Sequence, residues 1–179
     1  MSESENHLKI SNQTFSNEID LEKYVEWNAL SRIDFIDCRF KRIDFLGKII
    51  NFCNFKNSEF NDLSFRKCQF GKSTFENCQF GEIDLTRAEL RYCKFLNCRF
   101  VDCDLSASDF CKCVFFETSF NNTNLKFSIA EDIKFWKSTK FYKSNSNEFV
   151  EVKNQSNFEK ILKDMNLIIF TGQDEIENC

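Results

Sequence analysis

The chain has 179 residues, a formal net charge of −4, ten Cys, a single His and no Pro. It contains no run of 18 apolar residues, which argues against a membrane-spanning helix, and its acidic start lacks the apolar run of a signal peptide. With one His and none of the glycine motifs of nucleotide-binding or nucleophilic sites, we expect no enzyme, no catalytic residue and no cofactor.

Residues 1–30 follow the pattern of the later chain only in part. Ile10 and Phe15 stand in phase with it, Asp20 breaks it, and Leu21 begins what resembles a short helix face. The open end of a repetitive fold exposes unpaired backbone and core side chains. We therefore expect residues 1–30 to form an N-terminal cap.

Residues 31–135 carry an apolar side chain, usually Phe, at every fifth position, and a small or apolar residue precedes most of them by two positions. Lys48 is the one clear exception to this second rule. A period of five matches neither a helix nor a strand, so the chain must turn a corner once per repeat and coil around its own axis. Residues 20 apart share their character, which predicts four repeats per coil and about five coils. Two columns of Phe are predicted in the core: Phe35, Phe55, Phe75, Phe95 and Phe115, and Phe40, Phe60, Phe80, Phe100 and Phe120.

This pattern resembles the pentapeptide-repeat proteins, whose repeat is a central Phe or Leu preceded two positions earlier by a small residue. The resemblance covers more than half of the chain without an insertion or deletion. It implies an all-β fold, a right-handed, four-sided (quadrilateral) β-helix solenoid, with an N-terminal cap and a C-terminal helical cap.

The cysteines occupy the inward position of the repeat, where a small hydrophobic side chain is needed. Buried, free Cys fits that role and points to the reducing cytoplasm, although stacked pairs such as Cys78 with Cys98 would join under oxidation. No C-x-x-C spacing occurs, which argues against a metal site. Cys111 is predicted to face outward and Cys179 is terminal, so these two are expected to be the reactive thiols. The inward cysteines are Cys38, Cys53, Cys68, Cys78, Cys93, Cys98, Cys103 and Cys113.

Residues 136–179 lose the period and are predicted to form a C-terminal cap. Ser156 to Glu159 has the form of a helix capping box, which predicts a helix over 156–165. Leu96, Phe116 and Trp136 lie 20 apart as an outward apolar ridge, and we expect residues 141–170 to cover it. The ending is similar to the C-terminal cap of quinolone-resistance and microcin-immunity members, which implies a tail-to-tail homodimer. The candidate cap and dimer residues are Trp136, Phe158, Ile161, Leu162, Met165 and Ile168.

The surface offers the remaining candidates. Asn57, Asn77 and Asn97 are predicted to stack as a structural amide ladder. An acidic face is predicted, with Asp84 over Asp104, and like charges so close are destabilising unless something compensates them. It is either a solvated face or the docking site of a basic partner, with calcium between the carboxylates as a remoter alternative. Its residues are Asp44, Asp62, Glu82, Asp84, Asp102 and Asp104.

The opposite face leans basic, with Arg32, Lys72, Lys94, Lys112 and Lys134. These residues look thinly spread and not interleaved with exposed aromatic side chains, which argues against direct binding of nucleic acid. The main hypothesis is therefore a non-catalytic, protein-binding solenoid with an unidentified partner. The alternative, implied by the resemblance, is protection of a type II topoisomerase such as DNA gyrase by mimicry of DNA. From Arg32 to Lys134 the charge is nearly balanced, with 16 Lys and Arg against 15 Asp and Glu, which counts against that alternative.

Overall fold

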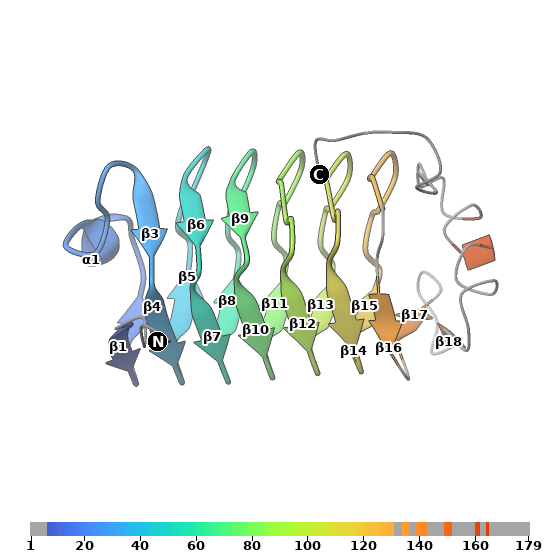
Figure 1. Ribbon diagram of the computed structural model, residues 1–179, viewed down its shortest axis with the longest axis horizontal. Coiled ribbons are helices and arrows are strands. Elements are labelled where there is room, and N and C mark those ends of the chain that lie inside the picture. The colour runs from blue at the N-terminus through green and yellow to red at the C-terminus, as the bar shows by residue number, and fades with distance from the viewer. Residues whose placement is uncertain are drawn as a thin grey trace, which may run out of the picture.

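The computed structural model describes residues 7–130 without a break, together with 134–136, 139–142, 149–151, 160–161 and 164. Short strands follow one another along the chain and wind into a solenoid whose coils stand side by side (Figure 1). Across these residues, no helix combines the length and the apolarity needed to cross a bilayer.

The strands are two to four residues long. They are β1 (Leu8–Ser11), β2 (Thr14–Phe15), β3 (Ala29–Ser31), β4 (Ile33–Ile36), β5 (Arg39–Lys41), β6 (Ile49–Asn51), β7 (Asn54–Lys56), β8 (Glu59–Asn61), β9 (Gln69–Gly71), β10 (Thr74–Glu76), β11 (Gln79–Gly81), β12 (Lys94–Leu96), β13 (Arg99–Val101), β14 (Val114–Phe116), β15 (Ser119–Asn121), β16 (Lys134–Trp136), β17 (Lys140–Tyr142) and β18 (Phe149–Glu151). The one listed helix, α1, is a single turn over Ile19–Glu22.

Four ladders of parallel pairing connect the coils. The first ladder is the sheet β1-β4-β7-β10-β12-β14-β16, and the second is β18-β17-β15-β13-β11-β8-β5-β2. The third consists of single bridges that link Asp44, Ser64, Asp84, Asp104 and Asn124 in turn. The fourth is β3-β6-β9, which single bridges continue to Ile129. In the central coils each partner lies 20 residues further on, so the prediction of an all-β solenoid with four repeats per coil is confirmed.

A left-handed backbone conformation makes each corner. From Arg32 to Phe127, every fifth residue has a φ between 48° and 66°, and of these only Gly47 is a glycine. Such a φ costs an ordinary residue roughly 1–2 kcal/mol. Hydrogen bonds between coils offset this cost, because the corner N–H donates to a carbonyl of the next coil. Asn77 N–H, for example, donates to the carbonyl of Leu96 at 2.9 Å.

The core is a set of stacked rings. Phe75 stacks on Phe55 and on Phe95, with the ring centroids 4.9 Å apart in both pairs. The two predicted columns of Phe meet edge to face, as at Phe75 and Phe80, where the centroids are 5.5 Å apart. The strand spacing of about 4.8 Å is therefore also the stacking distance of the rings.

The inward residue before each ring does more than fill space. Its hydroxyl or thiol donates to a carbonyl 23 residues earlier, as Ser73 Oγ does to Ile50 (3.0 Å) and Cys78 Sγ does to Phe55 (3.4 Å). All nine described cysteines are free and buried. Burial raises the pKa of the Cys93 thiol to about 12, and the same cause raises the pKa of its counterparts in other coils. These thiols stay protonated and unreactive at neutral pH.

The expectation for Cys111 is wrong, because its side chain is fully buried although its place in the repeat is outward. Its N–H donates to Asp109 Oδ1 at 2.8 Å, and its short side chain lies in the same row as the longer Arg91. Longer neighbours therefore shield it from solvent. Cys179 lies outside the described residues.

At the N-terminal end, α1 replaces one repeat of the first coil. Strands β1 and β2 pair with partners 25 residues further on, whereas β3 pairs with a partner 20 residues further on. The Asp44 N–H donates to Glu18 Oε1 at 2.8 Å, where the equivalent N–H of Ser64 donates to a backbone carbonyl. This bond lowers the pKa of the Glu18 carboxyl. A side chain thus completes the third ladder where the strand is missing.

At the C-terminal end, the second ladder continues one step past the repeats. Strand β17 pairs with β15 at an offset of 21 residues, and Phe141 stacks on Phe120 with centroids 4.9 Å apart. Strand β18 then pairs antiparallel to β17 and ends the ladder. Lys160, Ile161 and Asp164 are helical, and Ile161 is buried. The rest of the helix predicted over 156–165, and most of the predicted cover 141–170, lies outside the described residues.

Candidate interaction surfaces

The acidic face consists of two rows with different chemistry. Asp44, Asp84 and Asp104 form an inner row on the third ladder, in which Asp84 pairs with Asp104 as the period predicts. Each of these three carboxylates accepts a hydrogen bond from the backbone N–H two residues later, at 2.8 to 2.9 Å. This is the Asx turn that Asp and Asn favour. The inner row therefore has a structural task in turning the chain.

Neighbouring polar groups compensate the charge of the inner row. Asn124 Nδ2 donates to Asp104 Oδ1 at 3.1 Å, and Arg66 Nε lies 3.6 Å from Asp84 Oδ2. Asn124 also accepts from the N–H of Lys126, so an amide performs the same turn as a carboxylate. The like charges of successive coils are therefore separated or neutralised within the solenoid itself.

The outer row consists of Asp62, Glu82 and Asp102 at the left-handed corner before the third ladder, with φ of 53° to 55°. All three side chains are exposed. Asn122 Nδ2 donates to Asp102 Oδ1 at 2.6 Å. Within the described part of the chain, no hydrogen bond or ion pair engages the carboxylate of Asp62 or Glu82. These exposed corners are the part of the acidic face that fold geometry leaves unexplained.

The amide ladder runs along a different corner. Asn97 Nδ2 donates to Asn77 Oδ1 at 2.9 Å, Asn77 donates to Asn57 at 3.0 Å, and Asn57 donates to Asp37 Oδ1 at 3.1 Å. All four residues have a left-handed backbone. Asn adopts this conformation more readily than most residues, and its side chain both donates and accepts. The structure gives the row a stabilising role, as predicted.

The apolar ridge is present as register, since Leu96 pairs with Phe116 and Phe116 with Trp136. The Phe116 side chain is 37% exposed. Of the candidate cap and dimer residues, Ile161 is buried, and Trp136 is placed only by its strand. The others, Phe158, Leu162, Met165 and Ile168, lie outside the described residues.

Two further features bear on small ligands. Across the described ranges, no group of three or more His, Cys, Asp or Glu side chains has the arrangement of a metal site. A cavity of about 230 Å³ lies between α1 and the first coil, lined by Leu21, Val25, Phe45 and Lys48 among others. Lys48, the exception to the inward pattern, therefore stands where α1 replaces a repeat.

One row was missed by the sequence analysis. Arg32, Phe52, Lys72, Tyr92 and Lys112 occupy successive positions of the corner between the fourth and first ladders. Cations and aromatic rings alternate along this row, so the expectation that the two are not interleaved is wrong. Aligning residues 20 apart would have found it.

Comparisons with known proteins agree with the fold and go no further. A family model described as the SV2A/B/C luminal domain matches residues 45–120, fewer than half of the chain. No curated protein matches the sequence.

Among solved structures, the chain resembles QnrB1, a plasmid-mediated fluoroquinolone resistance protein, with 10% identity and a TM-score of 0.45 over 71% of this chain and 86% of that one. It also resembles AT2G44920, a pentapeptide repeat protein from the Arabidopsis thaliana thylakoid lumen, with 20% identity and a TM-score of 0.42 over 59% and 68%. A third is HetL, a pentapeptide repeat protein involved in heterocyst differentiation regulation in Nostoc sp. strain PCC 7120, with 7% identity and a TM-score of 0.38 over 73% and 62%. The recognised neighbours are thus pentapeptide-repeat proteins, in agreement with the five-residue period of the described coils.

Proposed function

We propose that this chain is a non-catalytic binding protein whose outer acidic row docks a basic surface of a protein partner. The observation that carries this proposal is the difference between the two acidic rows. The inner row is engaged in turns of its own backbone, whereas Asp62, Glu82 and Asp102 are exposed at corners one coil apart. Regularly spaced exposed carboxylates offer a linear array of negative charge, which favours complementary Lys and Arg.

The proposal includes the compartment and the organisation of the chain. Nine free, buried cysteines support a reducing cytoplasm. We retain the division into an N-terminal cap (1–30), the β-helix (31–135) and a C-terminal cap (136–179). We also retain a homodimer through the C-terminal segment, for which the buried Ile161 is the described candidate.

A pair of matched variants tests the docking surface. The outer-row variant is Asp62→Asn, Glu82→Gln and Asp102→Asn, and the inner-row control is Asp44→Asn, Asp84→Asn and Asp104→Asn. Both remove three negative charges, and Asn124 supports retention of the turns in the control. A partner that wild type and control capture, and that the outer-row variant loses, is the expected result. Capture that is indifferent to the outer row would contradict the proposal.

The second candidate function is protection of a type II topoisomerase by partial mimicry of DNA, in which the same outer row would stand in for phosphates. Its test is a DNA gyrase supercoiling assay with the purified protein, with and without a drug that stabilises cleaved DNA. Protection by wild type and the inner-row control, but not by the outer-row variant, would support it. No effect of the wild-type protein at tens of micromolar would refute it.

The dimer has a separate test. Ile161→Glu places a charge at a buried position of the C-terminal segment, and it should convert a dimer to a monomer in analytical ultracentrifugation at micromolar concentration. A monomeric wild-type mass at that concentration would contradict this part of the proposal.

A further inference from the structure

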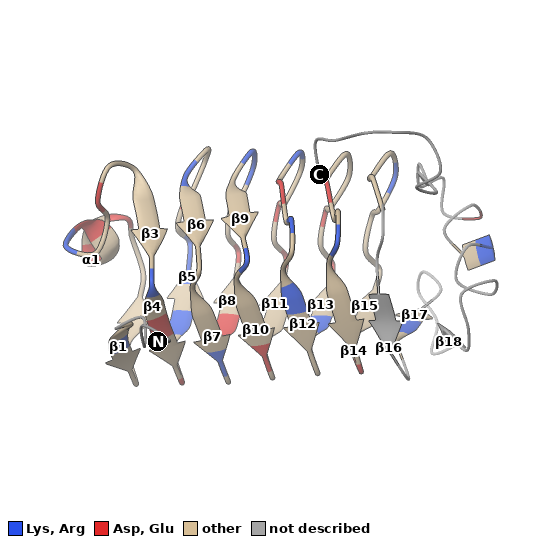
Figure 2. Cartoon of the chain, in the orientation of Figure 1, with Lys and Arg blue, Asp and Glu red and all other residues tan. Residues whose placement is uncertain are grey.

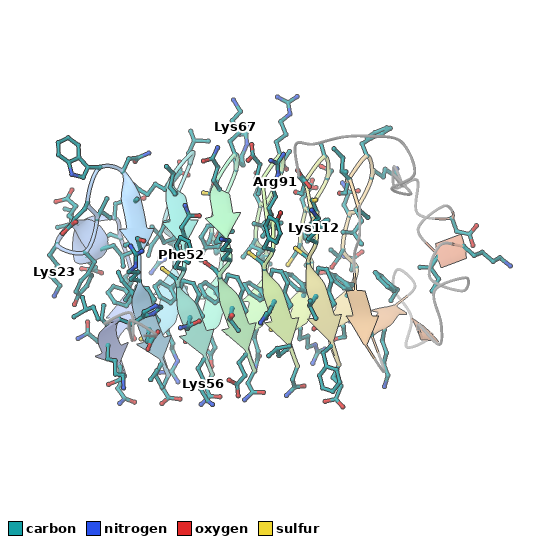
Figure 3. All side chains as sticks on the ribbon, viewed as in Figure 1. Lys23, Phe52, Lys56, Lys67, Arg91 and Lys112 are labelled. Carbon is teal, nitrogen blue, oxygen red and sulfur yellow. The ribbon has the colours of Figure 1, made fainter. Side chains whose placement is uncertain are left out.

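The row of Arg32, Phe52, Lys72, Tyr92 and Lys112, which we call the cation–aromatic row, presents charge and rings together. The Arg32 guanidinium and the Lys72 ammonium each lie 5.4 Å from the Phe52 ring centroid, on successive coils. The Lys112 ammonium lies 5.4 Å from the centroid of Tyr92. Figure 3 shows Phe52, Arg91 and Lys112 following one another along the coils. Each ring thus separates cations that would otherwise be one coil apart.

Positive charge gathers on the two faces that meet at this row. Over residues 32–36, 47–56, 67–76, 87–96 and 107–116 there are nine Lys and Arg against four Asp and Glu. The intervening residues 37–46, 57–66, 77–86, 97–106 and 117–126 have six against nine. Lys and Arg recur in the upper loops of successive coils (Figure 2). The solenoid therefore has a basic side and an acidic side along its whole length.

Most carboxylates of the basic side are engaged within the chain. Asp109 pairs with Arg91 at 2.8 Å, Glu76 with Lys56 at 3.0 Å, and Asp34 Oδ1 lies 2.7 Å from the ring of His7. By contrast, Lys67, Lys72 and Arg87 are exposed, and none of them forms an ion pair with a described carboxylate. These three cations keep their charge available to an outside anion.

Exposed rings lie on the same side. Tyr92 is 40% exposed in the cation–aromatic row. At the corner between the third and fourth ladders, Trp27 is 98% exposed and Phe127 is 65% exposed, with Lys67 and Arg87 between them in the same row. Trp27 has a φ of 50°, an unfavourable conformation for a bulky residue, at the tip of a turn closed by Glu26 and Ala29.

We infer that this basic side binds single-stranded nucleic acid along the solenoid axis. Lys67, Lys72 and Arg87 would hold phosphates, and unpaired bases would stack on rings such as Tyr92 and Trp27. A groove or face that combines cations with stacking platforms at regular intervals is how proteins bind single strands without sequence preference. This surface is distinct from the acidic row of the proposed function, and the inference stands independently of it.

Other polyanions fit these observations less well. An extended acidic peptide gains most of its affinity by adding to a sheet edge, but in the central coils the backbone groups along the faces are used between coils. An anionic membrane favours a continuous apolar patch, whereas Trp27 and Phe127 are separated by about 24 Å, five coils, with charged residues between them. A duplex buries its bases and could not use the rings.

The test is a titration of a fluorescently labelled oligothymidylate of about twelve nucleotides with the full chain, followed by anisotropy at several salt concentrations. The row variant is Arg32→Gln, Lys72→Gln and Lys112→Gln. Its matched control is Arg39→Gln, Lys41→Gln and Arg99→Gln, which removes the same charge from the second ladder. The row variant should bind at least about tenfold more weakly and lower the slope of log K against log salt by about two, and the control should stay within about twofold.

A second pair of variants tests stacking without changing charge. Tyr92→Ala should weaken binding by about tenfold, and Tyr92→Phe, which keeps the ring, should retain it. Thermal unfolding by circular dichroism checks the fold of each variant, and the single change Lys72→Gln at an exposed corner replaces any variant that fails to fold.

Three results would overturn the inference. The first is an equal loss of binding in the row variant and its control, which would mean attraction by net charge alone. The second is the same affinity for Tyr92→Ala as for wild type. The third is no binding of oligothymidylate together with binding of poly-glutamate or of phosphatidylserine vesicles, which would assign the basic side to an acidic protein or to a membrane. A result of this kind would leave the outer acidic row and its partner assay unaffected.

Discussion

Phe80→Ala tests whether stacked rings are what hold the coils together. Phe80 is 3% exposed at the centre of the solenoid. Its ring stacks on Phe60 at 4.8 Å and on Phe100 at 4.5 Å, and it meets Phe75 and Phe95 edge to face at 5.5 and 6.2 Å. Truncation removes all four ring contacts at once and leaves a void of about the volume of the ring.

The expected cost is in the upper part of the range for buried Phe→Ala, about 4–5 kcal/mol. The neighbouring rings cannot collapse into the void, because hydrogen bonds between coils fix them at the strand spacing. Phe80 N–H and C=O belong to β11, which pairs on both sides with β8 and β13. Relaxation, which lowers the cost of many core truncations, is therefore limited here.

The measurement is urea unfolding followed by circular dichroism. With a slope of about 2 kcal/mol per molar, the midpoint should fall by about 2 M. Phe116→Ala, on the apolar ridge and 37% exposed, is the matched control and should cost less than about 1.5 kcal/mol. Similar midpoints for Phe80→Ala and wild type would refute the reasoning, as would equal costs at the two positions. Because repeat arrays can unfold in parts, a second probe must give the same transition.

Three further predictions concern the corners, the close contacts and the thiols. Asn77→Ala removes two amide bonds and leaves a φ of 54°, so the free energy of unfolding should fall by about 1–2 kcal/mol, and Asn77→Gly should recover part of the loss; equal costs for the two would contradict the role of the backbone. Gly71→Ala places a methyl 2.6 Å from Asn51 Oδ1, which accepts from the Gly71 N–H at 2.7 Å, so it should cost about 1 kcal/mol, and less when Asn51→Ala is also present in a double-mutant cycle. The pKa of the Cys93 thiol is raised from 9.0 to about 12, so the folded state holds this proton more tightly, and its contribution to stability is complete below pH 9 and is lost between pH 9 and 12, at about 1.4 kcal/mol per pH unit. Thermal unfolding across that window should therefore be steeper in pH for wild type than for Cys93→Ser, which introduces the residue that Ser73 already supplies in this position; identical slopes would contradict it.

The core could be predicted from the sequence because burial obeys a single rule. Every fifth side chain points inward, so the period identifies the Phe columns without knowledge of any neighbour. The amide ladder followed from the same arithmetic applied to residues 20 apart, and Asn77 lies between its two predicted partners.

The surface was harder to predict because charge alone does not show what a side chain contacts. Asp44, Asp84 and Asp104 read as a binding face, yet each accepts a bond from its own turn. Cys111 read as exposed, but packing by longer neighbours buries it. The helix α1 left no period to follow, so the 25-residue first coil emerged only from strand pairing.

The two periods of this solenoid differ in what they protect when the length of the chain changes. Loss of five residues from a coil would keep each later Phe on an inward position, but it would turn all later coils by one face. The two acidic rows, the amide ladder and the cation–aromatic row would then each be cut in two, although the core could still form. Loss or gain of twenty residues would leave every row aligned. Selection on the fold alone would therefore tolerate steps of five, whereas selection on a long surface would tolerate only whole coils, and the 20-residue pairing from β4 to β16 is the outcome expected of the second kind.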